Sequence, residues 1–364
     1  MLATPAIMLS HKIQLQPTVK QEIYLSKACG IARFTWNWAL NEWDSQYQAG
    51  LKPSGMFLKS KFNALKQEHF PWIYEVTKYA CQQPFIHLQT AFRNFFSKRA
   101  SYPKFKKKGI HDSFYVGNDQ IKITDNYLKL PKLEYIKMRE RLRFAGKIMS
   151  VTISRVADKW FAAIQVKLES VFTDICENQA SVGIDLGIKS LAVLSNGEVV
   201  EGSKSLKKNL KKLKKLQRQM SRKKKGSKNR NKLRIKVARL HYRIACIRND
   251  ILHKLTTYLT RNFKHIGIED LNVSGMMKNH NLARAILDMG FFEFKRQLEY
   301  KAILRGNKVT IADRWYPSSK TCSTCGYVNS KLTLADRMYK CPECGLFIDR
   351  DLNAAINLEK LTNH

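Results

Sequence analysis

Four cysteines near the end of the chain place the strongest constraint on its fold. Cys322 and Cys325 form one C-x-x-C pair, and Cys341 and Cys344 form a second pair after fifteen intervening residues. A C-x-x-C turn presents two thiolates from one tight loop, and tetrahedral zinc takes four such ligands. Because cysteine fills all four positions, the sequence predicts one structural Zn²⁺ ion. Two disulfides are the alternative, but nothing else in the chain suggests an oxidising compartment.

The charge balance is the second constraint. The 364 residues include 65 Lys and Arg against 29 Asp and Glu, a formal net charge of +36. Such an excess repels itself unless a polyanion neutralises it, so nucleic acid is the expected partner. An anionic membrane surface is the alternative, although no run of about 18 apolar residues exists to span a bilayer. Residues 1–9 lack the basic start of a signal peptide, so we expect a cytoplasmic protein without a membrane partner.

The first half of the chain combines helical and strand patterns. Residues 7–16 partly alternate as a strand, whereas residues 19–48, 56–69 and 77–99 follow helical periodicity. Residues 101–178 contain stretches of period two, which predict a small antiparallel β-domain. We expect the strand at 7–16 to join this β-domain, so that the helices between them form an insertion.

Aromatic residues are frequent in this half. Phe85 and Phe92 belong to an apolar stripe within residues 77–99 that could stack on bases, but its spacing favours a packed helical core. Residues 101–108 form a basic linker interleaved with aromatics. Within it, Lys104 and Lys106 are candidate nucleic-acid contacts.

The densest positive charge lies in residues 204–264. No acidic residue occurs between Gly202 and Asn249, and leucines at helical spacing predict a basic helical hairpin with a narrow apolar seam. One sign of charge destabilises an isolated helix, so phosphate should lie close in the working state. The expected nucleic-acid contacts are Lys207, Lys208, Lys211, Lys214, Arg218, Arg222, Lys223, Lys224 and Arg230.

Three acidic residues lie at the ends of predicted elements. Asp185 interrupts an apolar strand, Glu269 ends a later strand and Asp351 begins the last helix. A buried strand rarely carries an aspartate unless a cation meets it, and Gly187 after it should allow close approach of a ligand or neighbouring strand. An RNase H-like fold gathers acids from two strands and a helix in this way to bind two divalent cations. For Asp351 alone, an ordinary helix cap is the alternative.

The remaining elements are simpler. We expect one long helix at 282–304, a strand at 308–313 and a closing helix at 351–361. The other four cysteines fall in predicted helices or strands and should be buried or inert. They are Cys29, Cys81, Cys176 and Cys246.

Four stretches together resemble one known family. They are 183–187 (GIDLG), 267–271 (GIEDL), 313–326 (DRWYPSSKTCSTCG) and 349–355 (DRDLNAA). In order, spacing and sequence they are similar to the TnpB (OrfB) family, which bacterial insertion sequences encode and which is related to type V CRISPR effectors. The resemblance covers essentially the whole chain.

The resemblance implies an RNA-guided DNA endonuclease of an insertion sequence, which cuts at a single RuvC-like site beside a short recognition motif. It implies a guide RNA from the element's own end and a double-stranded DNA target, and we expect a monomer with its RNA, associated with the bacterial nucleoid. Asp185, Glu269 and Asp351 match the family's RuvC acids, which hold two Mg²⁺, and the four cysteines match its zinc-binding module. A guided DNA-binding regulator without cleavage and a strand-transfer transposase are the alternatives.

The expected architecture is an α/β RNase H-like (RuvC) nuclease domain with an inserted zinc ribbon. An α-helical recognition segment inserted in a small antiparallel β wedge domain precedes it. The expected segments are the wedge strand at 1–16, the helical recognition segment at 17–100, the β-rich wedge domain at 101–178, the RuvC-like domain at 179–314 with the basic hairpin at 204–264, the zinc-binding target-nucleic-acid module at 315–348 and the final RuvC helix at 349–364.

Two further acids neighbour the expected ligands. Side chains two positions apart at a helix start diverge widely, so Asp349 should cap the helix or pair with Arg350 while Asp351 binds metal. Asp270 should point to the opposite face of its strand from Glu269.

Overall fold

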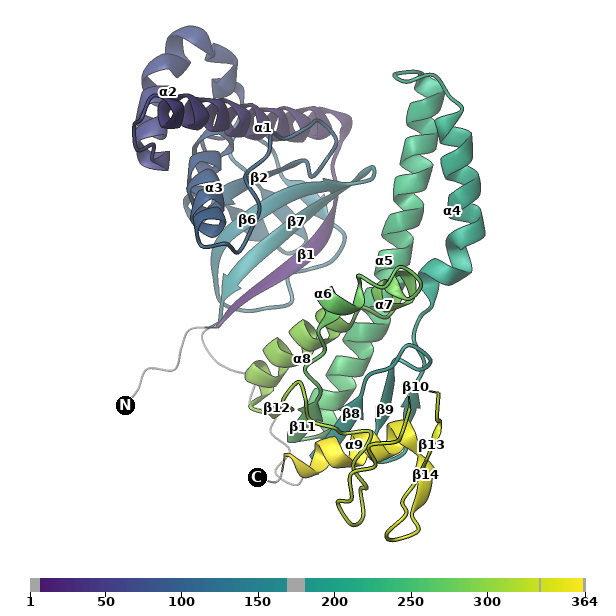
Figure 1. The fold of residues 1–364 in the computed structure, drawn as a ribbon. Coiled ribbons are helices and arrows are strands. Elements are labelled where there is room, and N and C mark those ends of the chain that lie inside the picture. Colours follow the sequence, from purple (N-terminus) through teal and green to yellow (C-terminus); the bar gives the residue numbers. More distant parts are fainter. Residues whose placement is uncertain (1–6, 169–180, 334, 363–364) are drawn as a thin grey trace, which may run out of the picture. The chain divides into compact units, whose positions relative to one another are not determined.

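The computed structural model describes residues 7–168, 181–333 and 335–362 (Figure 1). The chain divides into two compact units, Met1–Ser170 and Val171–His364. Among the described residues, no helix is long and apolar enough to cross a membrane. Cys176 lies outside the described residues.

The first unit is built on a seven-stranded antiparallel sheet in the order β2-β6-β7-β1-β5-β4-β3. β1 pairs along the whole of β7, from Met8 opposite Lys167 to Leu15 opposite Trp160. The N-terminal strand therefore joins the later β-strands, as predicted. The strands are β1 (Met8–Gln16), β2 (Ser113–Gly117), β3 (Lys122–Thr124), β4 (Tyr127–Lys129), β5 (Ile136–Met138), β6 (Lys147–Val156) and β7 (Lys159–Lys167).

Helices fill the insertion between β1 and β2. They are α1 (Val19–Gln48), α2 (Gly55–His69), the 3₁₀ turn η1 (Pro71–Glu75) and α3 (Tyr79–Phe96). Phe85 and Phe92 of α3 are buried, and Phe92 stacks on Trp43 of α1 with ring centroids 4.0 Å apart. The prediction that the aromatic stripe forms a helical core is therefore confirmed for these residues.

The second unit contains a five-stranded mixed sheet in the order β10-β9-β8-β11-β12. β8, β11 and β12 are parallel, and β9 and β10 continue antiparallel from β8. The strands are β8 (Ser181–Asp185), β9 (Ala192–Leu194), β10 (Val199–Val200), β11 (His265–Ile268) and β12 (Lys308–Ile311). Apolar residues of β8 and β11, such as Ile184 and Ile268, pack with Leu255 of α5 (Lys228–Asn262) and Phe294 of α8 (Phe291–Arg305).

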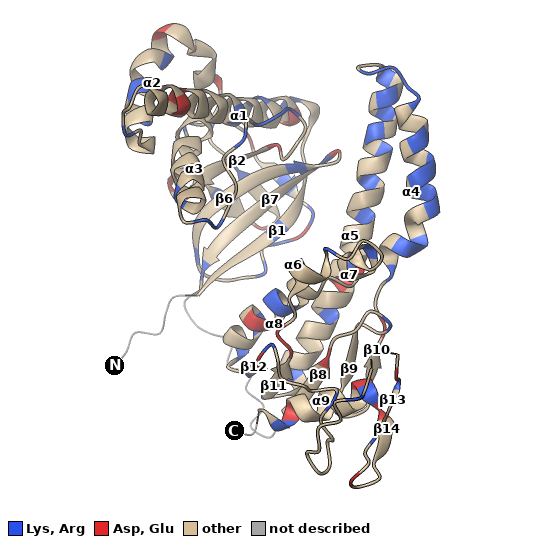
Figure 2. Cartoon of the chain, in the orientation of Figure 1, with Lys and Arg blue, Asp and Glu red and all other residues tan. Residues whose placement is uncertain are grey.

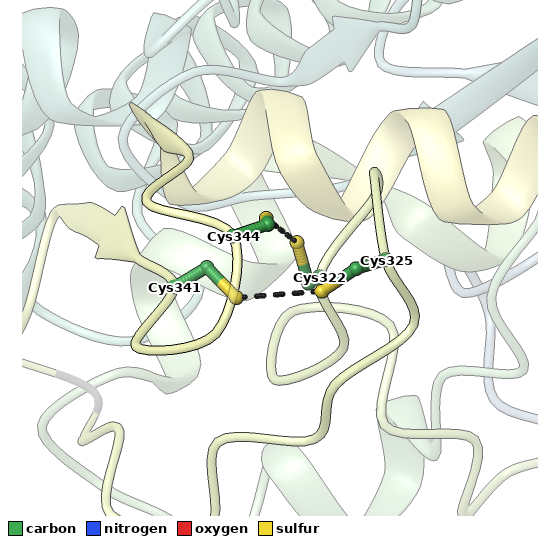
Figure 3. A group of neighbouring side chains, drawn as sticks. All are labelled: Cys322, Cys325, Cys341 and Cys344. Carbon is green, nitrogen blue, oxygen red and sulfur yellow. Dashed lines mark hydrogen bonds between the residues drawn. The ribbon is translucent and has the colours of Figure 1, made fainter.

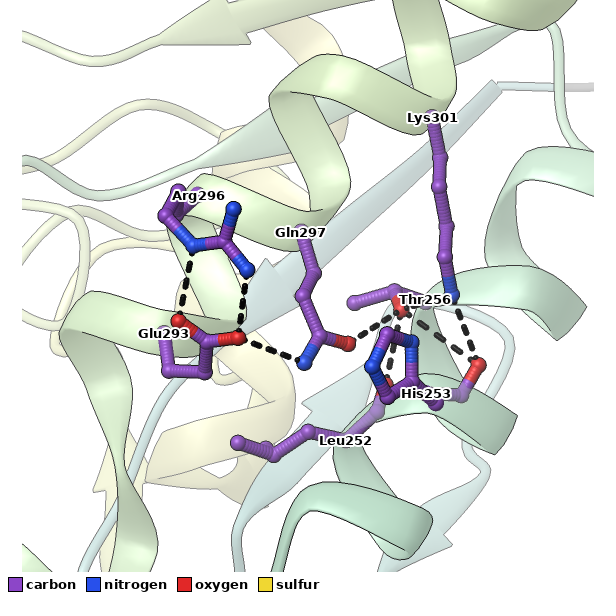
Figure 4. A network of polar contacts seen from close by, with 7 residues as sticks. All are labelled: Leu252, His253, Thr256, Glu293, Arg296, Gln297 and Lys301. Carbon is purple, nitrogen blue, oxygen red and sulfur yellow. Dashed lines mark hydrogen bonds and ion pairs between the residues drawn. The ribbon is translucent and has the colours of Figure 1, made fainter. Parts of the chain in front are cut away.

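The contact between α5 and α8 also has a buried polar strip (Figure 4). Gln297 of α8 is fully buried, donates to Glu293 at 2.9 Å and lies 3.2 Å from the hydroxyl of Thr256. Lys301 donates to that hydroxyl and to Thr257. These bonds fix which face of α8 meets α5.

The last helix, α9 (Arg350–Lys360), lies directly on the opposite face of this sheet. Gly183 of β8 and Gly267 of β11 are register partners. A Cβ on Gly183 would come within 1.9 Å of the Ala355 carbonyl, and one on Gly267 within 2.1 Å of the Leu358 carbonyl. Only glycine allows this approach, because the obstructing atoms are backbone. At Gly187, a Cβ would lie 3.0 Å from the Ser190 carbonyl, and the expected approach of a ligand there stays a prediction.

A basic helical hairpin extends from the second unit (Figures 1 and 2). It consists of α4 (Ser205–Ser221) and α5, and its apolar seam includes Leu213, Val237 and Leu240, as predicted. α4 has no side-chain cap of its own. The buried carboxylate of Asp288 on α7 (Ala283–Met289) instead accepts from the backbone N–H groups of Leu206 and Lys207 at 3.0–3.1 Å.

The predicted single helix at 282–304 is wrong. The chain forms two helices, α7 and α8, separated by Gly290 in the left-handed region at φ +76°. The apolar pattern continues through the break, so periodicity alone did not reveal it. A further turn of helix, α6 (Val273–Met276), precedes α7.

Because α9 rests on the backbone at Gly183 and Gly267, a methyl group at either position should displace the helix. We expect Gly183→Ala or Gly267→Ala to lower the free energy of unfolding of the second unit by about 1–3 kcal/mol, the range for overpacking. Gly30→Ala is the matched control. Gly30 lies inside α1, and a Cβ added there would meet only the end of the Arg33 side chain, at 3.9 Å. That change should stabilise the first unit by about 0.5–1 kcal/mol.

Denaturant titration followed by a probe in each unit measures both effects. Unfolding of Gly183→Ala at the wild-type midpoint would contradict the packing described for α9.

Candidate active site and cysteine cluster

Two parallel strands bring two of the predicted acids side by side. Ile184 of β8 pairs with Ile268 of β11, so Asp185 and Glu269 occupy the next positions along adjacent strands. Side chains alternate between the faces of a sheet, so both acids share the face of Gly183 and Gly267. This is the face that α9 covers.

The third acid comes from α9. Asp351 lies in its first turn, and Asp349 is the N-cap, accepting from the N–H groups of Asp351 at 2.9 Å and Leu352 at 3.1 Å. The capping role predicted for Asp349 is confirmed. Oδ1 of Asp349 accepts both of these bonds, and the charge of Asp349 also raises the pKa of Asp185. The Asp351 carboxylate lies 3.4 Å from the Arg350 guanidinium.

Asp270 and Glu269 have different partners. The Asp270 carboxylate pairs with Arg314 at 2.5 Å and Lys295 at 3.1 Å, and hydrogen bonds from these two side chains hold its pKa below the usual range. Glu269 instead accepts a hydrogen bond from the hydroxyl of Ser318, and its charge raises the pKa of Asp185. Because β11 ends at Ile268, the expected opposite orientation of Asp270 stays a prediction.

The acids interact strongly with one another. Burial raises the pKa of Asp185 well above its usual value, and the nearby Glu269 and Asp351 carboxylates raise it further. Burial also raises the pKa of Glu269, partly offset by the Ser318 hydrogen bond, and Asp351 adds to the increase. Desolvated carboxylates that repel each other fit a divalent cation, which would hold them charged. Among the described residues, the four cysteines are the only group of three or more His, Cys, Asp or Glu residues whose ligand atoms gather closely enough to hold a metal ion, so the acids are less tightly gathered than the thiols.

The four cysteines form one cluster (Figure 3). The sulfurs of Cys322 and Cys344 are 3.6 Å apart, and those of Cys325 and Cys341 are 3.5 Å apart. Disulfide bonding requires about 2.0 Å, so the structure contradicts the alternative of two disulfides. A tetrahedral ion with Zn–S bonds of about 2.3 Å separates its sulfurs by about 3.8 Å, so the cluster could hold zinc.

The two cysteine turns have the same backbone pattern. In the first, the N–H of Gly326 donates to the Cys322 carbonyl at 3.0 Å, and in the second that of Gly345 donates to the Cys341 carbonyl at 3.2 Å. Both glycines have positive φ, at +80° and +73°. The second turn joins the two strands of a short hairpin, β13 (Met338–Lys340) and β14 (Phe347–Asp349), and β14 leads directly into α9.

Two buried asparagines of α9 bind the first cysteine turn. Asn353 accepts from the N–H of Ser323 at 2.9 Å and donates to the Thr321 carbonyl at 2.7 Å. Asn357 donates to the carbonyls of Thr321 and Ser318. The residue that hydrogen-bonds Glu269 is therefore held by the same helix that carries Asp351.

Sequence reasoning missed Ser318, Asn353 and Asn357. All three are polar residues with at most 4% exposure. The available signal was position. Both asparagines lie on the buried face of α9, with Ala354 and Leu358, where an amphipathic helix normally carries apolar residues.

The predicted nucleic-acid contacts differ in their surroundings. Lys207, Lys208, Lys211, Lys214, Arg218, Arg222, Lys223 and Lys224 are exposed along α4 and its connection to α5. Arg230 is half-buried and donates to the carbonyls of Met220 and Lys223, closing that connection. Lys104 is exposed, and the ammonium of Lys106 lies over the ring of Trp36 at 4.0 Å. All eleven stay predictions as nucleic-acid contacts.

The scattered cysteines are only partly as expected. Cys29 and Cys81 are buried, and burial raises the pKa of both thiols. Cys246, on α5, is free and exposed, so for this thiol only the expectation of inertness remains, and it stays a prediction.

Comparison with known proteins identifies the family. A protein of Escherichia coli (strain K12), "Putative RNA-guided DNA endonuclease InsQ", is 36% identical over 96% of this chain and 91% of the relative. The chain belongs to the TnpB (OrfB) family. A "Putative RNA-guided DNA endonuclease" of Streptomyces pristinaespiralis is 38% identical over 96% of this chain and 88% of that protein. The OrfB family model of IS605, described as "Probable transposase", matches residues 163–280.

Two regional matches and one solved structure add detail to this TnpB-family chain. A Cas12f1-like TNB domain matches residues 291–358, which include the cysteine cluster. A model described as a helix-turn-helix domain matches residues 7–52, although this region consists of strand β1 and the continuous helix α1. The Cas12f1 chain of a Cas12f1–sgRNA–target DNA complex has the same fold, with a TM-score of 0.60 at 13% identity over 97% of this chain and 99% of that one.

The cysteine geometry leads to a metal-content prediction. We expect one zinc ion per purified chain, lost in Cys344→Ser and retained in Cys246→Ser, because only the first substitution removes a ligand of the cluster. Elemental analysis gives the zinc content, and a chelator should make four further thiols reactive in the wild type. Wild-type protein that contains no zinc with its thiols reduced would contradict a zinc site.

Proposed function

We propose that this chain is an RNA-guided DNA endonuclease of an insertion sequence that hydrolyses phosphodiester bonds at a RuvC-like site. One observation carries the proposal: Asp185 and Glu269 are in register on adjacent parallel strands, on the sheet face covered by the helix that carries Asp351. The order of the five strands and this position of the last helix support an RNase H-like nuclease domain. Relatives that match nearly the full chain are named as endonucleases of this kind.

The acids are proposed to hold two Mg²⁺ ions. Asp185, Glu269 and Asp351 would hold them, because Glu269 and Asp351 both lie near enough to Asp185 to raise the pKa of its carboxyl. When bound, such ions activate a water molecule for attack on the phosphodiester and stabilise the leaving oxygen. The chain's own contribution is orientation: Ser318 donates to one oxygen of Glu269, and Asp349 fixes the first turn of α9.

The partners are proposed to be a guide RNA from the element's own end and a double-stranded DNA target. The exposed cations of α4 belong to a stretch of sequence, from Gly202 to Asn249, that contains no acidic residue (Figure 2). Pairing between guide and target would supply sequence choice, while the protein contacts the phosphate backbone and a short duplex motif. The recognition segment is proposed at 17–100 and the wedge at 1–16 and 101–178, so that the first unit contains both except for residues 171–178.

The remaining boundaries are part of the proposal. The RuvC-like domain is placed at 179–314, the zinc-binding target-nucleic-acid module at 315–348 and the final RuvC helix at 349–364. The zinc-binding module would carry a structural ion, because its four cysteines leave no open coordination position.

We expect Asp185→Ala, Glu269→Ala or Asp351→Ala each to reduce Mg²⁺-dependent cleavage about a thousandfold or more, because each removes a proposed cation ligand. Guided binding to target DNA should persist in all three. Asp349→Asn is the matched control: asparagine is an equally good N-cap, so cleavage should remain substantial. Cleavage gels paired with binding measurements on the same complexes give both quantities.

The outcomes separate the alternatives. Full activity in Asp351→Ala would overturn its assignment, and loss of binding in all three variants would show that the acids are structural. Guided binding with no cleavage by the wild type would indicate a regulator. Joined rather than hydrolysed DNA ends would indicate a strand-transfer transposase.

The hairpin charge leads to a separate expectation. RNA affinity should fall steeply with salt because each neutralised phosphate releases counterions. Replacing Lys207, Lys208, Lys211 and Lys214 by Gln should reduce the steepness of the log–log salt dependence by about 3, while replacement by Arg should preserve it. Glutamine is a good helix former, so α4 should remain folded. A wild-type affinity independent of salt would contradict the assignment of the hairpin.

A further inference from the structure

A cavity of about 400 Å³ lies beside Glu269. Its volume falls within the range of ligand-binding pockets. Leu186, Leu271, Val273 and Phe291 contribute apolar walls. Since Glu269 also lines the cavity, its occupant would lie next to the bond being cut.

One wall is a single face of α8. Phe292, Lys295, Arg296 and Glu299 line the cavity and have the i, i+3, i+4, i+7 spacing of one helical face. Phe292 is 71% exposed. An aromatic ring held open to solvent at the mouth of an apolar cavity offers a stacking surface.

The opposite side of α8 fixes this wall in place. Glu293, Gln297 and Lys301 face α5, and the fully buried Gln297 lies within hydrogen-bonding distance of Thr256 (Figure 4). Phe292 is therefore presented by an anchored helix and not by a free loop.

Two of the lining cations lie beside a single carboxylate. Lys295 and Arg314 both line the cavity and both pair with Asp270, at 3.1 Å and 2.5 Å, which leaves one formal positive charge among these three groups. Elsewhere in the lining, Arg296 is paired with Glu293, and Glu269 and Glu299 are acidic, so the positive charge is local to Lys295 and Arg314. An apolar interior with this local positive charge matches a nucleotide, whose base is flat and whose phosphate is negative.

We propose that this cavity holds one nucleobase of the DNA strand being cut, stacked on Phe292, with an adjacent phosphate near Lys295 and Arg314. This rests on the proposed function, because Glu269 places the cavity at the cleavage site. The base is bound by stacking on its aromatic face and not by hydrogen bonds to its edge, so the subsite accepts any of the four bases. Its effect is to position the neighbouring phosphodiester against the acids.

The first test is stacking, measured without cleavage. Guide-loaded Asp185→Asn is bound to targets that carry 2-aminopurine at successive positions around the cut. Fluorescence should be quenched at one position, and Phe292→Ala in the same background should restore it. Ile303→Ala is the matched control, since Ile303 is 66% exposed on the same helix face, three turns away and outside the cavity. Equal fluorescence with and without Phe292 at every position overturns the inference.

The second test is rate. Phe292→Ala should lower kcat/KM for a complete target about tenfold, within the usual worth of one base–aromatic stack. An abasic site at the quenched position should lower the wild-type rate equally and cause no further loss in Phe292→Ala, since both remove the same contact. Additive losses, or a wild-type rate in Phe292→Ala, overturn the inference while leaving the nuclease assignment intact. Quenching that depends on Phe292 in a protein that never cuts supports the subsite and refutes the proposed function.

Discussion

The second unit depends on the contact between α9 and the bare backbone of two strands. Gly183 and Gly267 lie side by side and remove the side chains that would otherwise hold the helix away. Two residues after these glycines, at the ends of the same strands, come Asp185 and Glu269. Because side chains alternate between the two faces of a sheet, the glycines and the acids lie on the same face. Because α9 cannot move outward without losing this contact, the carboxylate of Asp351 stays near the sheet. The two glycines therefore determine how closely Asp351 approaches the two strand acids.

The cysteine cluster and the acids form one connected structure. Asn353 and Asn357 bind the first cysteine turn to α9, and Ser318 at the start of that segment donates to Glu269. A distortion at the cysteines would therefore reach both a strand acid and the helix that carries Asp351. Each hydrogen bond involves a buried polar group, and a buried group left unpaired costs about 1–3 kcal/mol. The cysteine segment is thus linked to two of the acids through hydrogen bonds of Ser318, Asn353 and Asn357.

The sequence predicted most of this arrangement because strong local signals carried it. A carboxylate inside an apolar strand, paired cysteines at fixed spacing and a stretch without acidic residues each have few structural explanations. The break at Gly290 was not predicted because apolar periodicity runs through it, and a glycine inside a helical pattern does not by itself end the helix. The roles of Ser318 and Asn353 depend on contacts between segments distant in sequence, which a local pattern cannot reveal. The packing of α9 on Gly183 and Gly267 was not predicted, because it joins segments about ninety to one hundred and seventy residues apart and is known only from the fold.

The first helix of the basic hairpin is capped by a distant residue, Asp288. The carboxylate that completes the start of α4 belongs to α7, more than eighty residues later, and it is buried. Because α5 runs unbroken from the hairpin into the core of this unit, α5 sets the direction of the hairpin, while Asp288 fixes where α4 begins beside it. In a genetic screen for lost guide-RNA binding, substitutions of this acid would be recovered together with those of the surface lysines, and sequence alone would misassign their cause. Natural substitutions at Asp288 could therefore shift α4, and with it the cations proposed to contact RNA, without changing any of those cations.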